Sequence, residues 1–216
     1  MSNSKHNLRL LTGPERKSLQ TTKYLAFLLH GWGSDGNDLI QLSDYWSEEF
    51  PNMTFCSPHA PEVCSGNPQG RQWFDIMSQN MDLRTQGLDE AYQDLESYIT
   101  DKLNFYNVEK SNYFLIGFSQ GTMLALHAAI RRECLGIIGY SGAFIYKNFP
   151  DNIKKNDIIL LHGKNDTIVP LEKMESAYKK LQDKSSFIEC FTYDDLEHSI
   201  NEKGIEQAKI FMKDRI

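Results

Sequence analysis

The stretch YFLIGFSQGTMLALHAAI, residues 113–130, decides the fold class of this chain. Its first six residues are apolar apart from one glycine, which is typical of a strand buried on both faces. From Thr122 onward, Ala, Leu and Met dominate, and these are strong helix formers. Between the two lies Gly117-Phe-Ser-Gln-Gly121, a G-x-S-x-G pattern whose glycines permit a sharp turn that leaves a serine hydroxyl projecting above a sheet. Strand, turn and helix in this order predict an α/β protein.

Apolar runs of strand length alternate with longer helical segments along the rest of the chain. This alternation predicts a mostly parallel central sheet with helices on both faces. We expect the strands at Tyr24–His30, Met53–Ser57, Tyr113–Phe118, Leu135–Tyr140, Ile158–His162 and Phe187–Tyr193, with a weaker one at Asn7–Leu11.

Helix signals fill the intervals between these strands. Apolar residues recur at three- and four-residue steps from Leu88 to Leu103, and Pro170 is placed to begin a later helix. Ser199-Ile-Asn-Glu202 matches a capping box ahead of a final helix. The segment from Pro58 to Gly87 is long and rich in Gly and Pro, so we expect an irregular binding loop or lid there, at about residues 58–87.

Length and charge narrow the class of protein. The chain has 216 residues, 40% of them hydrophobic, and a formal net charge of −6. A chain of this length buries about 70% of its unfolded surface, so we expect one domain over residues 1–216. The negative charge argues against a nucleic-acid partner, because basic side chains drive binding to phosphates. Residues 1–7 lack the apolar core of a secretion signal, and no apolar run could span a membrane, so we expect a cytoplasmic location.

Four cysteines have no spacing typical of a metal or redox site. Neither a C-x-x-C pair nor a nearby histidine at zinc-finger spacing is present, so no metal is predicted. In a reducing compartment these residues are expected to be free thiols. They are Cys56, Cys64, Cys134 and Cys190.

A serine hydroxyl becomes a good nucleophile when a base takes its proton and an acid orients that base. Where a strand-turn-helix unit carries the serine, the acid and then the histidine follow it along the chain. His198 is the histidine beyond the candidate acids, and it lies between a predicted strand and a predicted helix. Asp166 follows the buried run Ile158–Gly163, whereas the later aspartates lie in polar stretches. We therefore predict Ser119 as nucleophile, Asp166 as orienting acid and His198 as base.

Acyl transfer also needs N–H donors for the oxygen that becomes negative. One is expected from the backbone of Gln120, and the other from Trp32 in the glycine-rich loop Leu29-His-Gly-Trp-Gly33. The same loop contains Gly31-Trp-Gly-Ser-Asp-Gly36, which matches the G-x-G-x-x-G dinucleotide fingerprint. That fingerprint requires an acidic residue about 20 positions later. The chain reads Phe55-Cys-Ser-Pro-His59 there, which disfavours a nicotinamide or flavin site.

With these residues in view, the chain resembles the carboxylesterase and acyl-protein thioesterase family of small α/β-hydrolases over nearly its whole length. The order and spacing of five blocks make this resemblance more specific than G-x-S-x-G alone. The blocks are Leu29-His-Gly-Trp-Gly33, Pro58-His-Ala-Pro61, Trp73-Phe-Asp-Ile76, Gly117-Phe-Ser-Gln-Gly121 and His162-Gly-Lys-Asn-Asp-Thr-Ile-Val-Pro170.

The resemblance implies a cytosolic enzyme that cleaves carboxylic esters or thioesters without a cofactor. It gives Ser119, Asp166 and His198 the triad roles and makes Trp32 and Gln120 the oxyanion donors. Two differences stand out: Trp32 replaces a smaller aliphatic residue, and the stretch before His198 lacks a glycine that the family often carries there.

The substrate stays open among simple esters, lysophospholipids and acylated proteins. Five residues in or beside the long loop are candidates for an acyl pocket, although they could equally anchor the loop to the core. They are Trp73, Phe74, Ile76, Met77 and Leu83. Because a fold does not determine a function, the alternative is a non-catalytic ligand-binding protein on a hydrolase scaffold.

Overall fold

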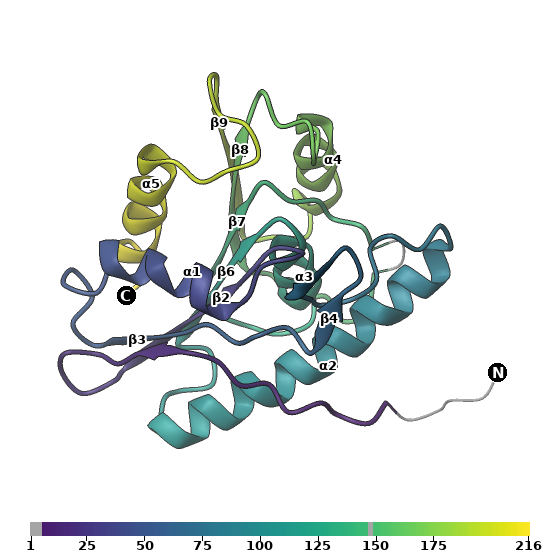
Figure 1. Ribbon diagram of the computed structural model, residues 1–216. Helices are drawn as coiled ribbons and strands as arrows, with labels where there is room; N and C mark the ends of the chain where they lie inside the picture. Colours follow the sequence, from purple (N-terminus) through teal and green to yellow (C-terminus); the bar gives the residue numbers. More distant parts are fainter. Residues whose placement is uncertain (1–5, 147–148) are drawn as a thin grey trace.

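The computed structural model describes residues 6–146 and 149–216 (Figure 1). Its centre is a seven-stranded sheet in the order β1-β3-β2-β6-β7-β8-β9. Neighbouring strands run parallel, except that β1 is antiparallel to β3. The strands are β1 (Glu15–Arg16), β2 (Tyr24–Leu29), β3 (Met53–Cys56), β6 (Tyr113–Phe118), β7 (Gly136–Tyr140), β8 (Asp157–Gly163) and β9 (Phe187–Tyr193).

Helices cover both faces of this sheet, as Figure 1 shows. One face packs against α2 (Met81–Tyr106), α3 (Gln120–Ala129) and α4 (Leu171–Leu181). The other packs against α5 (Glu202–Lys213) and the short pair α1 (Gly36–Leu39) and η1 (Ile40–Tyr45). Side chains alternate between the two cores along each strand, so Phe27 of β2 joins the first core and Leu28 the second. The predicted α/β architecture is confirmed.

Six of the predicted strands are present within one or two residues of their expected ends. The weaker prediction at Asn7–Leu11 is wrong, because that segment forms no strand and the first strand is Glu15–Arg16. Leu8 and Leu10 are 59% and 86% exposed, and Leu11 is the residue of this segment that packs into the first core. The backbone N–H of Arg9 donates instead to the Asp94 carboxylate.

Two further expectations need correction. The capping box at Ser199–Glu202 does not form, because Asn201 is the N-cap of α5 and its side chain accepts from the N–H of Gly204 at 2.8 Å. The segment 58–87 is not irregular throughout. It contains the hairpin β4 (Glu62–Cys64) and β5 (Asn67–Gln72) and the first turns of α2. A lid role for this segment stays a prediction.

Within the described ranges, no helix is both long and apolar enough to cross a membrane. The four cysteines are free thiols, and Cys56 and Cys64 are buried. Residues 1–5, which belong to the stretch predicted to lack a secretion signal, lie outside the described residues.

A buried asparagine joins the end of α3 to the start of β7. The Asn156 amide nitrogen donates to the carbonyls of Ala129 and Arg132, and its oxygen accepts from the N–H of Cys134 at 2.9 Å. Asn156 is only 4% exposed. The contact with Ala129 is buried and the other two are partly buried, and a buried backbone group that loses its partner costs about 1–3 kcal/mol.

Replacing Asn156 with Ala is therefore expected to lower the free energy of unfolding by about 2–4 kcal/mol. Urea denaturation followed by circular dichroism would measure the change. The matched control is Asn152→Ala at an exposed position, which should shift stability by less than about 0.5 kcal/mol. Equal effects of the two substitutions would contradict this account of Asn156.

Candidate active site

Ser119 occupies a strained turn between β6 and α3. Its backbone angles, φ 53° and ψ −113°, lie where residues other than glycine are rarely found. A Cβ atom at Gly117 would lie 2.4 Å from the nitrogen of Thr122, and one at Gly121 would lie 1.8 Å from the carbonyl oxygen of Leu29. Both positions therefore require glycine. The Ser119 N–H donates to the carbonyl of Tyr140 at 2.9 Å, which holds the turn against β7.

His198 and Asp166 meet beyond the carboxyl ends of β8 and β9. His198 Nδ1 lies 2.7 Å from Asp166 Oδ2, and the Asp166 side chain is fully buried. The second oxygen, Oδ1, accepts from the N–H groups of Ile168 at 2.9 Å and Val169 at 2.8 Å. A buried carboxylate with these donors is stable as an anion and holds the imidazole through Nδ1. The second ring nitrogen, Nε2, is then the one available for proton transfer.

The His198 ring lies against the residue that precedes the serine. The ring centres of Phe118 and His198 are 5.0 Å apart. Within the described residues, the hydroxyl of Ser119 forms no hydrogen bond with His198. Such hydrogen bonds are often long in enzymes without substrate. The structure thus joins His198 to Asp166 directly and places the pair beside the turn that carries Ser119.

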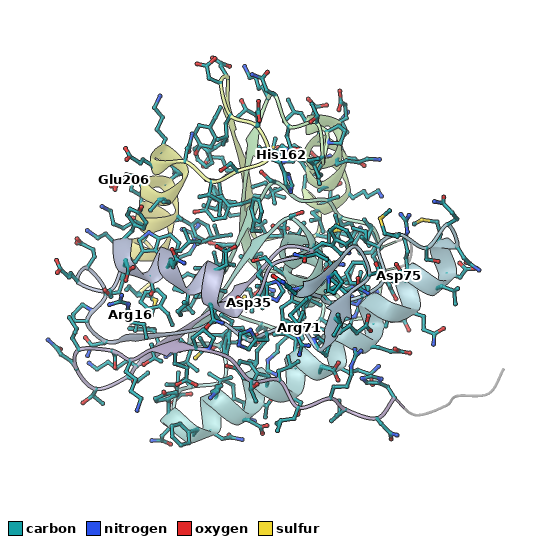
Figure 2. The ribbon with its side chains drawn as sticks, in the orientation of Figure 1. Arg16, Asp35, Arg71, Asp75, His162 and Glu206 are labelled. Carbon is teal, nitrogen blue, oxygen red and sulfur yellow. The ribbon has the colours of Figure 1, made fainter. Side chains whose placement is uncertain are left out.

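A second histidine, His162, lies near the same carboxylate oxygen of Asp166 that contacts His198. It is 1% exposed, and its Nε2 lies 2.7 Å from the carbonyl oxygen of Val169 and 3.3 Å from Asp166 Oδ2. Figure 2 labels this side chain among the ends of the later strands. The sequence shows only that His162 lies at the end of a strand. Its contacts with Val169 and Asp166 could not be predicted, because they form only when the following loop folds back.

The loop that follows β2 lies next to Ser119. A Cβ atom at Gly31 would lie 3.3 Å from the Ser119 Cβ. In the part of the chain that the structure describes, the backbone N–H groups of Trp32 and Gln120 donate to no protein acceptor. Both predicted oxyanion donors are therefore free to bind an oxygen from outside the chain.

His30 fastens this loop from inside the protein. Its Nδ1 donates to the carbonyl of Gly31 at 2.8 Å, and its Nε2 accepts from the N–H of Ala60 at 3.0 Å. Burial lowers the pKa of His30 to about 4, so the ring stays neutral near pH 7 and keeps both contacts.

The five residues suggested for an acyl pocket have different environments. Trp73 and Phe74 are fully buried, and Ile76 packs against the first core. Met77 and Leu83 are 61% and 57% exposed. A contact with substrate stays a prediction for all five.

The buried segment at Trp73 and Phe74 is tied to the residue after the nucleophile. The Gln120 side-chain oxygen accepts from the Trp73 N–H at 2.9 Å, and its nitrogen donates to the Phe74 carbonyl at 2.8 Å. From the sequence, Gln120 is predicted only as a backbone N–H donor. The anchoring of Trp73 and Phe74 by its side-chain amide is not evident there.

A chain of side-chain hydrogen bonds runs from the Trp32 indole to α2. The indole N–H donates to Gln72 at 3.1 Å, and the amide of Gln72 donates to Glu62 at 3.0 Å. The guanidinium of Arg9 then bridges Glu62 and Asp94, with both contacts at 2.7 Å. The β4–β5 hairpin also pairs with the loop after β2 through Arg71, which Figure 2 labels. The bulky indole is therefore held by the hairpin.

Metal-ligating side chains do not gather in the described ranges: no group of three or more His, Cys, Asp or Glu residues there could hold a metal ion.

Comparisons with known proteins give a consistent result. The sequence model of the phospholipase/carboxylesterase family matches residues 15–216. Esterase YpfH of Escherichia coli (strain K12) is 25% identical over 207 residues, which cover 94% of this chain and 86% of that protein. Acyl-protein thioesterase 1 of Gibberella zeae is 23% identical over 88% of this chain and 90% of its own. The crystal structure of esterase PE8 superposes with a TM-score of 0.90 and 32% identity, covering 96% of this chain and 100% of that one.

The buried neutral state of His30 predicts a pH-dependent loss of stability. Unfolded histidine has a pKa of roughly 6.5, so the unfolded state binds an extra proton as the pH falls from about 6.5 towards 4. His30 alone should then reduce the free energy of unfolding by about 2 kcal/mol between pH 7.5 and pH 5. His30→Gln keeps an amide oxygen that can accept from Ala60 but has no group that titrates in this range. Between pH 7.5 and pH 5, the free energy of unfolding of this variant, measured by urea titration, should therefore fall by about 2 kcal/mol less than that of the parent. An unchanged pH dependence in the variant would refute the assignment.

Proposed function

Because the chain belongs to the phospholipase/carboxylesterase family of α/β-hydrolases, we propose that it cleaves carboxylic esters through a triad of Ser119, His198 and Asp166. The observation that carries this proposal is the 2.7 Å contact between His198 Nδ1 and the fully buried Asp166 carboxylate, beside the strained turn at Ser119.

In the first half of the reaction, His198 Nε2 takes the proton of the Ser119 hydroxyl, and the oxygen attacks the carbonyl carbon of the ester. The negative oxygen that develops is bound by the N–H groups of Trp32 and Gln120. Each such donor is worth about 3 kcal/mol in the transition state. When the tetrahedral intermediate collapses, the bond to the alcohol breaks and His198 returns the proton to the leaving oxygen.

In the second half, a water molecule replaces the alcohol. His198 takes its proton, the resulting hydroxide attacks the acyl-enzyme, and the carboxylic acid leaves as Ser119 recovers its proton. Asp166 stays ionised throughout and stabilises the imidazolium that forms twice per cycle. No cofactor takes part in these steps.

The substrates that we propose are acyl esters, with acyl thioesters of small molecules or proteins as a second set. This follows the names of two relatives, an esterase and an acyl-protein thioesterase. We propose that the acyl chain contacts Ile76, Met77 and Leu83. Trp73 and Phe74 would instead anchor that segment through their hydrogen bonds with Gln120. The four free thiols fit a reducing compartment such as the cytoplasm.

Replacing Ser119 with Ala should reduce hydrolysis of p-nitrophenyl butanoate at least about 10³-fold, because the variant lacks the attacking oxygen. It should also abolish labelling by a fluorophosphonate probe, which reacts with activated serines. Ser111→Ala, at an exposed position just before β6, is the matched control and should keep parental rates and labelling. A folded Ser119→Ala protein that retains parental turnover would exclude this triad. A parent protein that shows neither turnover nor labelling would favour the non-catalytic ligand-binding alternative.

A further inference from the structure

A cavity of about 400 Å³ opens beside His198 on the face of the sheet that α1, η1 and α5 cover. Leu42 and Tyr45 of η1 form one wall, and Phe118, His198 and Ile200 contribute to the others. Leu42, Phe118 and Ile200 also pack against the second core. The segment around Trp73 and Phe74 belongs to the first core, on the other face. The cavity and that segment therefore lie on different sides of the strand that carries Ser119.

The chemistry of ester cleavage places the leaving group next to the histidine. When the carbon–oxygen bond breaks, the electron pair goes to the alcohol oxygen, which takes its proton from His198 Nε2. The oxygen must lie within hydrogen-bonding distance of that nitrogen, at about 3 Å. The alcohol portion of the substrate consequently extends from the imidazole, and His198 is among the residues that line the cavity.

The polar part of the wall carries a negative charge. Asp38 lines the cavity, and one of its carboxylate oxygens accepts from the Ser34 hydroxyl at 2.7 Å. Neither Lys nor Arg is among the described residues that line it. A carboxylate without a compensating cation attracts a positive group and repels a phosphate.

We propose that this cavity is the leaving-group subsite, and that it selects esters of alcohols that are bulky, partly apolar and either neutral or cationic, against alcohols that carry phosphate. The inference rests on the proposed triad and adds a substrate class to it. In the step concerned, Ser119 Oγ forms a bond to the acyl carbon, the alcohol oxygen leaves, and the proton passes from serine through His198 to the alcohol.

Three butanoate esters test the proposal with the acyl group held constant. Ethyl butanoate has a leaving group too small to use the cavity, 3,3-dimethylbutyl butanoate has a bulky neutral one, and butanoylcholine is its cationic counterpart. Leu42→Trp should fill the cavity and raise KM for the two bulky esters about tenfold, while kcat/KM for ethyl butanoate stays within twofold. Tyr45→Ala, at a side chain that is 61% exposed, should fold normally and raise KM for the same two esters about threefold.

The charge is tested by Asp38→Asn. This variant should lower the preference for butanoylcholine over its neutral counterpart about threefold, since an exposed carboxylate attracts a cation only weakly. It should also improve hydrolysis of 2-(butanoyloxy)ethyl phosphate relative to ethyl butanoate. The control is Asp44→Asn, a carboxylate of η1 that pairs with Arg16 and does not line the cavity. It should leave all these ratios unchanged.

The outcomes separate this inference from the triad. If Leu42→Trp and Tyr45→Ala alter all three butanoates equally, or change the preference for acyl length in a series of ethyl esters, the cavity is not a leaving-group subsite. If Asp38→Asn and Asp44→Asn act alike, the charge selection is wrong. A failure of the triad itself would appear differently, as a Ser119→Ala protein that still hydrolyses ethyl butanoate.

Discussion

The arrangement of the site depends on one steric constraint, the close approach of the first turn of α3 to the end of β2. The carbonyl oxygens of Leu29 and His30 would lie 1.8 Å and 2.8 Å from a Cβ atom at Gly121. Only glycine permits that contact, and the contact brings the loop after β2 against the turn at Ser119. This packing requirement therefore places the loop that contains Trp32 beside the strained turn at Ser119.

Buried polar groups then hold the surrounding loops in place. Asp166 receives two backbone N–H groups besides His198, His30 joins Gly31 to Ala60, and the Gln120 amide joins α3 to Trp73 and Phe74. Burying any of these polar groups without a hydrogen-bond partner would be unfavourable. Each group therefore restricts its loop to conformations that keep the hydrogen bonds. A rigid arrangement of this kind suits catalysis, in which donors must be aligned before charge develops.

The sequence predicts the elements whose signals are local. Strands that are apolar on both faces, the long stripe from Leu88 to Leu103 and the turn at Ser119 can all be read from neighbouring residues. The β4–β5 hairpin could not be predicted in this way, because its segment is polar and rich in glycine. The roles of Asn156 and His162 could not be predicted either, because their partners are carbonyls and carboxylates that come near only in the folded chain. The cap of α5 is Asn201 rather than Ser199, since either residue satisfies the local pattern and the loop geometry decides between them.

The bridge that Arg9 makes between Glu62 and Asp94 affects where a stable shortened form of the protein can begin. The family model begins at residue 15, and the first strand begins at Glu15. A fragment trimmed to that boundary would retain Asp94, whose side chain is fully buried, and lose both the guanidinium and the backbone N–H that Arg9 supplies to it. A fragment that begins at residue 15 would therefore leave the buried Asp94 carboxylate without these two donors, so the stable domain includes the extended arm around Arg9.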